Sequence, residues 1–483
     1  MGIAIAFLLS ALLCAITIMA RPIIALYCIL FIVIFFEEFG VGFTSTTGSI
    51  FFNSDFLNLF KFKIIEVIIG SVYFFILITS KRKIRGSFSP LEKNIFIAFV
   101  IVVLFVCSIE LSRHGTVTVG GIRQIVPGIM LFHMYYLAIN TEGEFLQFVK
   151  VLIIMLSIRA FIGLVMLGVG HGIESPRGAV PFFWDSRQID AFAFGVILLS
   201  GYIAQYSKID LSHRLFSRSL AILFLCVLGF AVLLSFRRTV WFMAAVGIFF
   251  VMLSSRKVKI YHYVILAGVM TLVFVMVFSV PAFKDTRDRI IFYVEHSNIF
   301  NKDVAKQQEN AAHIDNLKQY YRIITEDKNI LFMGFRGRVD SNYTEFESKK
   351  GMGPLGTAHN GLLVTTLFFG LGGLILYLVF FLFPLFKYRI LYKQPDTSPV
   401  RYIGLGALIF FFLEFIPSLT FSPAFYTSVK GGFYVFTALF IVRSAVYYGN
   451  KPPSTKEISG RKEPIVPVKN RVILAKSRVI NSK

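Results

Sequence analysis

The sequence predicts an all-α polytopic membrane protein, and two features of its composition support that fold class. The chain of 483 residues is 56% hydrophobic and only 16% charged, whereas soluble domains carry about 25% charged residues. The apolar residues, among them 55 Phe, lie in long runs, and a membrane-spanning helix needs about 20 mostly apolar residues. This composition excludes a soluble globular protein and a disordered chain.

The apolar runs give about 12–14 spanning helices by that length criterion. The predicted spans cover residues 2–20, 22–38, 62–80, 92–109, 123–140, 148–169, 189–206, 219–236, 239–254, 260–280, 359–385, 402–418 and 431–447. They divide the chain into an N-terminal transmembrane bundle (1–280), a large loop (281–358), C-terminal transmembrane helices (359–447) and a basic tail (448–483).

The positive charge predicts the orientation of the helices. The net charge of +22 would indicate a polyanion partner in a soluble protein, but in a membrane protein basic residues mark the cytoplasmic loops. Basic clusters follow the spans that end near residues 80, 254 and 385, and the tail carries nine Lys or Arg against two Glu. Loop 281–358, with twelve Lys or Arg and eleven Asp or Glu, then faces outward, and its segment 307–328 is expected to form a surface helix. No nucleic-acid partner is expected.

His359 and Asn360 stand where the chain re-enters the membrane from the outward side. The positive end of the helix dipole disfavours an imidazolium ion at this position, so a neutral His359 could accept a proton there. That role suits a general base at an active site near the membrane surface. The alternative is a His-Asn pair that only caps the helix.

Arg237 and Arg238 form a tight turn between two predicted spans. Arginines at membrane depth are costly, and this pair lies on the outward side, against the positive-inside trend. An anionic ligand would explain both residues, because the guanidinium group binds phosphate through two parallel hydrogen bonds. The alternative is structural pairing with a carboxylate such as Asp190 or Glu414, the latter deep in a late span.

The outward loop before the span at 189–206 contains Arg177, Trp184 and Arg187 among other aromatic residues. Two explanations stay open. The aromatic faces and arginines could bind a sugar and a phosphate, or they could form an interfacial belt in which arginine side chains reach the headgroups. The sequence contains no metal-ligand cluster, P-loop or glycine-rich nucleotide motif, so no metal or nucleotide cofactor is expected.

Together these features resemble the O-antigen ligase and O-antigen polymerase family over about Arg177 to Tyr377. The matching residues, in order, are Arg177, Arg238, Arg322, the stretch 329–335 and His359-Asn360. Two departures occur: the family's glycine pair reads Gly334-Phe335-Arg336, and its Pro-Asn reads Asp185-Ser186-Arg187. Because of the second departure, either Arg177 or Arg187 could be the principal ligand in that loop.

The resemblance implies a GT-C-like architecture and a metal-independent, inverting glycosyl transfer from undecaprenyl pyrophosphate. In that reading Arg238, Arg237, Arg177 and Arg187 bind the pyrophosphate, His359 acts on the acceptor hydroxyl, and Arg322, Asn360 and Trp184 bind substrate. The acceptor would be a growing O-antigen or exopolysaccharide chain, or lipid A-core. The enzyme would lie in the bacterial inner membrane with its site on the periplasmic side, and chain-length regulator or export proteins are possible partners.

Two other classes of function are alternatives to this one. A transporter or flippase of lipid-linked sugar would contain inverted repeats, broken helices and several intramembrane charges, and the sequence shows no such repeat. A structural membrane protein of a polysaccharide export complex would need neither His359 nor Arg238.

Overall fold

The computed structural model describes the chain in separate stretches. They are residues 21–36, 55–57, 62–79, 90–114, 125–169, 173–175, 178–180, 186–235, 238–254, 361–395, 397–420 and 429–450, with a few isolated positions elsewhere. Two units are distinguished, residues 1–449 and 450–483. The predicted surface helix at 307–328 and the basic tail lie almost entirely outside the described residues.

The described residues confirm an all-α membrane protein. The longer helices are α2 (Pro22–Phe35), α4 (Ile64–Thr79), α5 (Pro90–His114), α6 (Ile125–Ala138), α7 (Glu142–Gly168), α8 (Ser186–Ala204), α9 (Arg218–Leu233), α10 (Arg238–Leu253), α17 (Gly361–Leu382), α19 (Pro399–Thr420) and α20 (Val429–Gly449). Each coincides with a predicted span. The predicted spans at 2–20 and 260–280 lie outside the described residues, apart from a few positions in the first.

Three segments among the described residues are long and apolar enough to cross a membrane: Glu142–Met166, Phe369–Lys393 and Lys430–Gly449. Other apolar helices are shorter; α10, for example, has 16 residues. At 1.5 Å per residue it is about 24 Å long, less than the roughly 30 Å of a bilayer core. The total of 12–14 spans therefore stays a prediction.

Short elements connect the long helices. The described residues include two antiparallel hairpins, β1 (Asp55–Leu57) with β2 (Phe62–Lys63) and β3 (Ile173–Ser175) with β4 (Gly178–Val180). The first hairpin ends in the first residues of the predicted span 62–80, and the second lies in the predicted outward loop before the span at 189–206. The 3₁₀ helices η1 (Tyr206–Lys208) and η2 (Leu211–His213) join α8 to α9, and η4 (Phe383–Lys387) with α18 (Tyr388–Lys393) joins α17 to α19.

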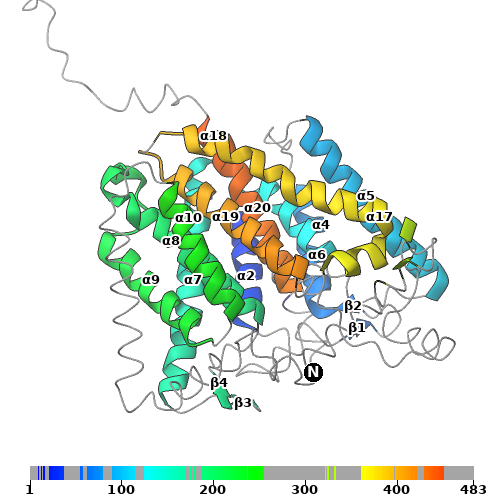
Figure 1. Ribbon diagram of the computed structural model, residues 1–483, viewed down its shortest axis with the longest axis horizontal. Helices are drawn as coiled ribbons and strands as arrows, with labels where there is room; N and C mark the ends of the chain where they lie inside the picture. Colours follow the sequence, from blue (N-terminus) through cyan, green and yellow to red (C-terminus); the bar gives the residue numbers. More distant parts are fainter. Residues whose placement is uncertain are drawn as a thin grey trace, which may run out of the picture. The chain divides into compact units, whose positions relative to one another are not determined.

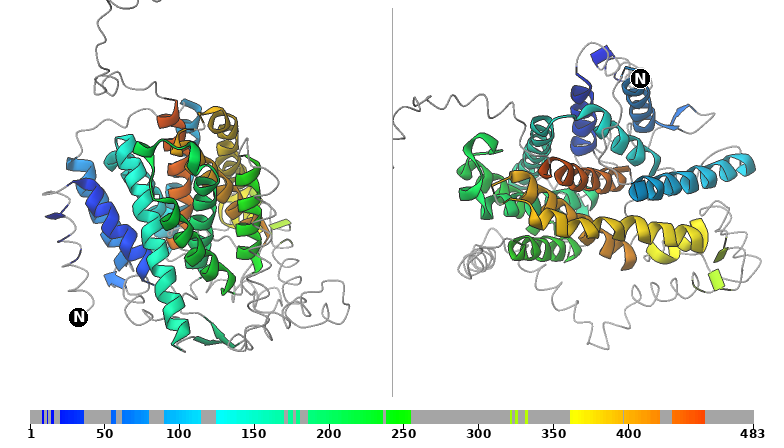
Figure 2. Two further views of the ribbon diagram at one scale, coloured as in Figure 1. Left: turned by 90° about the vertical axis from the view of Figure 1, so that its left-hand side faces the viewer. Right: turned by 90° about the horizontal axis from the view of Figure 1, so that it is seen from above.

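Helix α19 packs against α8, α10 and α20, and α8 also packs closely against α10. Figure 1 shows α19 and α20 in the middle of the bundle, with α7 to α10 on one side and α4, α5, α6 and α17 on the other, and the turned views of Figure 2 show α20 enclosed by its neighbours. Most of α20 is buried. Small residues allow this close approach, as is usual in membrane bundles.

Glycines fix how α8 lies against α10. A methyl group added at Gly201 would lie 2.7 Å from Val251, and one added at Gly247 would collide with Ile197. In both contacts a residue of α8 lies beside the residue of α10 that is fifty positions later in the sequence. Because this offset is constant along the helices, α8 and α10 run parallel. Against α19 the direction is reversed. The rings of Phe194 and Phe410 stack with centroids 4.3 Å apart, while a methyl group added at Gly406, earlier in α19, would lie 3.2 Å from Leu198, later in α8.

Hydrogen bonds define the two ends of the bundle. At one end, Gln394 Nε2 donates to the carbonyl oxygen of Ala445 (2.9 Å), and the hydroxyls of Ser254 and Tyr388 lie 3.2 Å apart. These bonds join α18 to the carboxyl ends of α10 and α20. At the other end, which we call the site end, α8, α10 and α20 begin and α19 ends.

We predict that Gly247→Val loosens the bundle, because the added side chain would collide with Ile197 and lie against Leu413. Overpacking of this kind costs about 1–3 kcal/mol of unfolding free energy, so the thermal unfolding midpoint in detergent should fall. The matched control is Gly229→Val in α9, where an added Cβ meets nothing within 4 Å. Equal midpoints for the two variants would contradict the packing described here.

Candidate functional site

The start of α8 carries the first predicted site residue that the structure describes. Arg187 is the second residue of this helix and Gln188 the third. Gln188 is almost fully buried, with 1% of its side chain exposed. The chain therefore enters the bundle immediately after Arg187, which places that residue at the boundary between the predicted outward loop and the helix core.

Arg238 is the first residue of α10 and lies level with Gln188. The pairs Gly201–Val251 and Ile197–Gly247 define the register of α8 against α10. Extended by about two and a half turns at 3.6 residues per turn, this register places Arg238 beside Gln188. The two described arginine positions, Arg187 and Arg238, thus belong to adjacent parallel helices that begin at the same level.

The turn before Arg238 is fixed by hydrogen bonds from its own residues. Trp241 Nε1 donates to the carbonyl oxygens of Val232 (2.8 Å) and Leu233 (3.1 Å), and Ser235 Oγ donates to Val232 (2.6 Å). These bonds satisfy carbonyl groups at the end of α9 that lack a partner within the helix. They tie the first turn of α10 to the last turn of α9, and so set where α10 begins.

A buried lysine joins α20 to the start of α8. Lys430 is the second residue of α20 and is completely buried, and its Nζ donates to Gln188 Oε1 at 3.2 Å. The starts of α8, α10 and α20 are therefore together at the site end. The positive ends of three helix dipoles, with basic residues in the first turn of each, favour an anion in their neighbourhood.

Two buried carboxylates lie deeper in the same region. Asp190 in α8 is 6% exposed and Glu414 in α19 is 4% exposed. Phe194 stacks on Phe410, and the same antiparallel register, extended by about one turn, places Asp190 opposite Glu414. These are the two acidic residues that the sequence offered as structural partners for arginine.

Helix α17, which begins directly after His359 and Asn360, is broken in its middle. Gly370 has φ 68° and ψ −175°, a backbone conformation that is essentially restricted to glycine. Across the break, Phe369 packs against Gly373 so closely that a methyl group on Gly373 would collide with it. The first part of α17, which directly follows the predicted motif in the sequence, thus takes its own direction.

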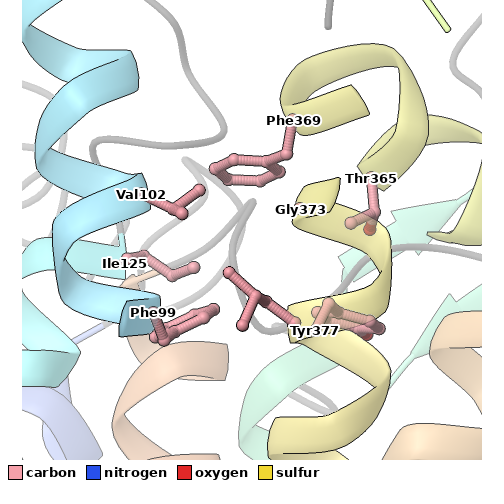
Figure 3. A pocket seen from close by; sticks show the side chains of 8 residues that line it. Phe99, Val102, Ile125, Thr365, Phe369, Gly373 and Tyr377 are labelled. Atoms are coloured by element: carbon pink, nitrogen blue, oxygen red, sulfur yellow. The ribbon is translucent and has the colours of Figure 1, made fainter. Parts of the chain in front are cut away.

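A small, narrow apolar pocket lies at this break. Figure 3 shows the Phe369 side chain extending from α17 toward α5 across the pocket. Its lining residues are Phe99 and Val102 of α5, Ile125 of α6, and Thr365, Phe369, Gly373, Leu376 and Tyr377 of α17. Such a lining suits hydrocarbon and would not solvate a diphosphate.

The predicted site residues divide into two groups. Arg187 and Arg238 lie in described helices, which bring their backbones to one level. Outside the described residues lie Arg177, Trp184, Arg237, Arg322, His359 and Asn360. For these the assigned roles stay predictions, although Arg237 directly precedes α10, and Asn360 directly precedes α17.

Sequence reasoning missed Gln188 and Lys430. Lys430 carries the same signal that drew attention to Arg237 and Arg238, a basic residue at the outward end of a predicted span. Gln188 carries no such signal, because nothing in the sequence indicates that its side chain meets a residue 242 positions away.

The fold and these helix ends define an all-α membrane protein with basic residues in the first turns of α8, α10 and α20. Residues 221–378 match the model of the family described as O-antigen ligase. The matched region includes α10 and most of α9 and α17. This match, over about a third of the chain, supports a relationship to membrane enzymes of the O-antigen ligase type. No curated protein matches the chain.

We predict that Trp241→Phe destabilises the α9–α10 turn, because both indole hydrogen bonds are lost while most of the apolar surface is kept. Val232 keeps its bonds from Ser235, whereas the Leu233 carbonyl loses its indole donor. This loss costs about 1 kcal/mol, and the thermal unfolding midpoint in detergent should fall accordingly. The control is Phe242→Leu, since Phe242 is the next residue and is 60% exposed. A midpoint unchanged in Trp241→Phe would show that the indole does not hold the turn.

We also predict that Gly370→Ala strains the break in α17 by about 1–3 kcal/mol, because alanine rarely adopts this conformation. Gly372, two residues further along α17, provides the control. Gly372 meets nothing within 4 Å and has no positive φ, so Gly372→Ala should be neutral or slightly stabilising. The measurement is thermal unfolding of both variants side by side, and a ranking in which Gly372→Ala is the less stable would refute the assignment.

Proposed function

We propose that this protein transfers or polymerises a glycan, taking it from undecaprenyl pyrophosphate and joining it to an acceptor sugar. The observation that carries the proposal is the common level of Arg187 and Arg238 at the starts of α8 and α10, within a chain whose residues 221–378 match the O-antigen ligase family. A lipid-linked diphosphate is an anion held at a membrane surface, and cationic helix ends suit it.

The leaving group determines what the site must provide. When the bond between the anomeric carbon and the diphosphate oxygen breaks, the electron pair goes to the diphosphate, which gains negative charge. Arg238, with Arg237, Arg187 and Arg177, would stabilise that charge through charge-assisted hydrogen bonds. Fixed cations at the ends of rigid helices need little reorganisation as the charge develops.

His359 is the proposed base of this reaction. The acceptor hydroxyl attacks the anomeric carbon from the face opposite the diphosphate, so the configuration inverts, and the hydroxyl proton passes to His359. Asn360, Arg322 and Trp184 would hold the two sugars. We place the reaction on the outward side of the inner membrane, because the site end joins the loops with the fewest net positive charges.

The acceptor is either a growing lipid-linked O-antigen or exopolysaccharide chain or lipid A-core, and the same residues serve both. A polymerase is favoured slightly, since loop 281–358 is large enough to contact two glycans. Chain-length regulator or export proteins would be partners of a polymerase.

A transporter or flippase of lipid-linked sugar is the second candidate, and one observation favours it. Helix α17 is broken at Gly370, and broken helices are typical of transporters. The two functions differ in outcome: transport moves the intact lipid-linked sugar across the membrane, whereas transfer breaks its bond to the diphosphate.

We predict that the purified protein, given undecaprenyl-pyrophosphate glycan, forms longer or transferred glycan, and that His359→Ala and Arg238→Ala lose this activity. Loss of a base typically costs 10²–10⁴-fold, and loss of a charge-stabilising donor about 10²–10³-fold. Activity should be the same with and without a chelator. Comparing Arg177→Ala with Arg187→Ala identifies which arginine is the principal ligand.

The control variant is Arg389→Ala, which removes an exposed arginine of α18 at the other end of the bundle. It should retain full activity. Wild-type activity that requires a divalent metal, or full activity in His359→Ala, would disprove the mechanism. Movement of the intact lipid-linked sugar across vesicles, with no new glycosidic bond, would favour the transporter.

A further inference from the structure

The side chains of Gln188 and Lys430 form a buried contact next to the proposed diphosphate site. Lys430 is 0% exposed and Gln188 1% exposed, and 3.2 Å separate Nζ from Oε1. Burying an ammonium group is costly, and the start of α20 adds an unfavourable interaction with the helix dipole. The hydrogen bond to Gln188 offsets part of this cost.

The lysine determines which way the Gln188 amide faces. An ammonium group has three donors and no acceptor, so the atom that faces it must be the amide oxygen. The Nε2 group is then directed away from Nζ as a donor. It is buried and has no hydrogen-bond partner among the described residues. A buried donor left unsatisfied costs about 1–3 kcal/mol, which a bound acceptor would recover.

The surroundings of Gln188 indicate what this acceptor is. Gln188 directly follows Arg187, and the register of α8 against α10 places it level with Arg238. Three helices with basic residues in their first turns begin here. An acceptor at this place carries negative charge, and an N–H donor beside cations matches a phosphate oxygen.

We propose that Gln188 Nε2 donates a hydrogen bond to a phosphate oxygen of the lipid-linked diphosphate, and that Lys430 is a positioning residue that holds the Gln188 amide in the required orientation. This inference rests on the proposed function, and it adds a neutral donor from α8 and a support from α20 to the arginines. Gln188 binds the donor substrate and the released polyprenyl diphosphate alike, because both carry the same phosphate oxygens.

The central test is Gln188→Glu, because this change separates binding from structure. A glutamate at position 188 keeps an oxygen for Lys430 and strengthens that contact, so the protein should be at least as stable as the wild type. It also replaces the Nε2 donor with a carboxylate oxygen that repels phosphate. We expect KM for undecaprenyl-pyrophosphate glycan, and the inhibition constant of undecaprenyl pyrophosphate, to rise about 10- to 100-fold.

The positioning role of Lys430 is tested with Lys430→Arg and Lys430→Met. Arginine retains donors for Gln188 Oε1 and should restore most of the affinity for undecaprenyl pyrophosphate, whereas methionine removes them and should weaken it. Gln188→Met, of similar size and without a donor, supplies a second variant should the glutamate fail to fold. The matched control is Gln205→Met, which alters another buried glutamine at the other end of α8 and should leave both constants unchanged.

The outcomes separate the two proposals. A folded wild-type protein that neither transfers glycan nor is inhibited by undecaprenyl pyrophosphate disproves the proposed function. A wild-type protein that does both, with unchanged constants in Gln188→Glu and Gln188→Met, overturns the role of Gln188 alone. Equal constants in Lys430→Met and the wild type overturn the positioning role.

Discussion

The close packing of α8 against α10 and α19 determines the level of each described residue in the candidate site. Gly201 and Gly247 allow α8 and α10 to approach, and the stacked rings of Phe194 and Phe410 fix α8 against α19. These contacts lie in the apolar middle of the helices. Lipid tails are as apolar as the side chains there, so the hydrophobic effect does not drive the helices together, and close packing has to stabilise their association. Because helices are rigid, a register fixed in the middle also holds at the ends.

The ends of the same helices carry the polar groups. Lys430, Gln188, Asp190 and Glu414 are all buried, and each would be costly in hydrocarbon without a partner. The hydrogen bond from Lys430 to Gln188 shows how the cost is reduced, since one polar group satisfies another across two helices. At the other end of the bundle, Arg401 lies over the rings of Tyr392 and Tyr402, with centroids 5.5 Å and 5.2 Å from its Cζ. Aromatic rings stabilise the cation there.

The fold class was predictable from the sequence, and so was part of the site. Long apolar runs require helices, because a backbone inside a bilayer has to satisfy its own hydrogen bonds, and each long described helix coincides with a predicted run. Arg187 and Arg238 were found as exceptions to the positive-inside trend, a signal that depends only on the order of charges along the chain. The break in α17 was not predicted, since the glycines around Gly370 are equally compatible with an unbroken helix that packs closely. The hairpins were also missed, because three-residue strands leave no detectable alternation.

By itself the sequence determined that this protein lies in a membrane and where its helices run along the chain. It also determined which arginines depart from the overall distribution of charge. These properties depend on local composition and on distances along the chain. Only the tertiary structure decided that Gln188 meets Lys430 and that Asp190 lies opposite Glu414. Such pairs join residues more than two hundred positions apart, and their register is set by side-chain packing at glycines and aromatic rings in the middle of the bundle. The local sequence pattern does not predict that register, because an apolar helix face can pack against its neighbour at several levels. Only the full set of tertiary contacts selects one of them.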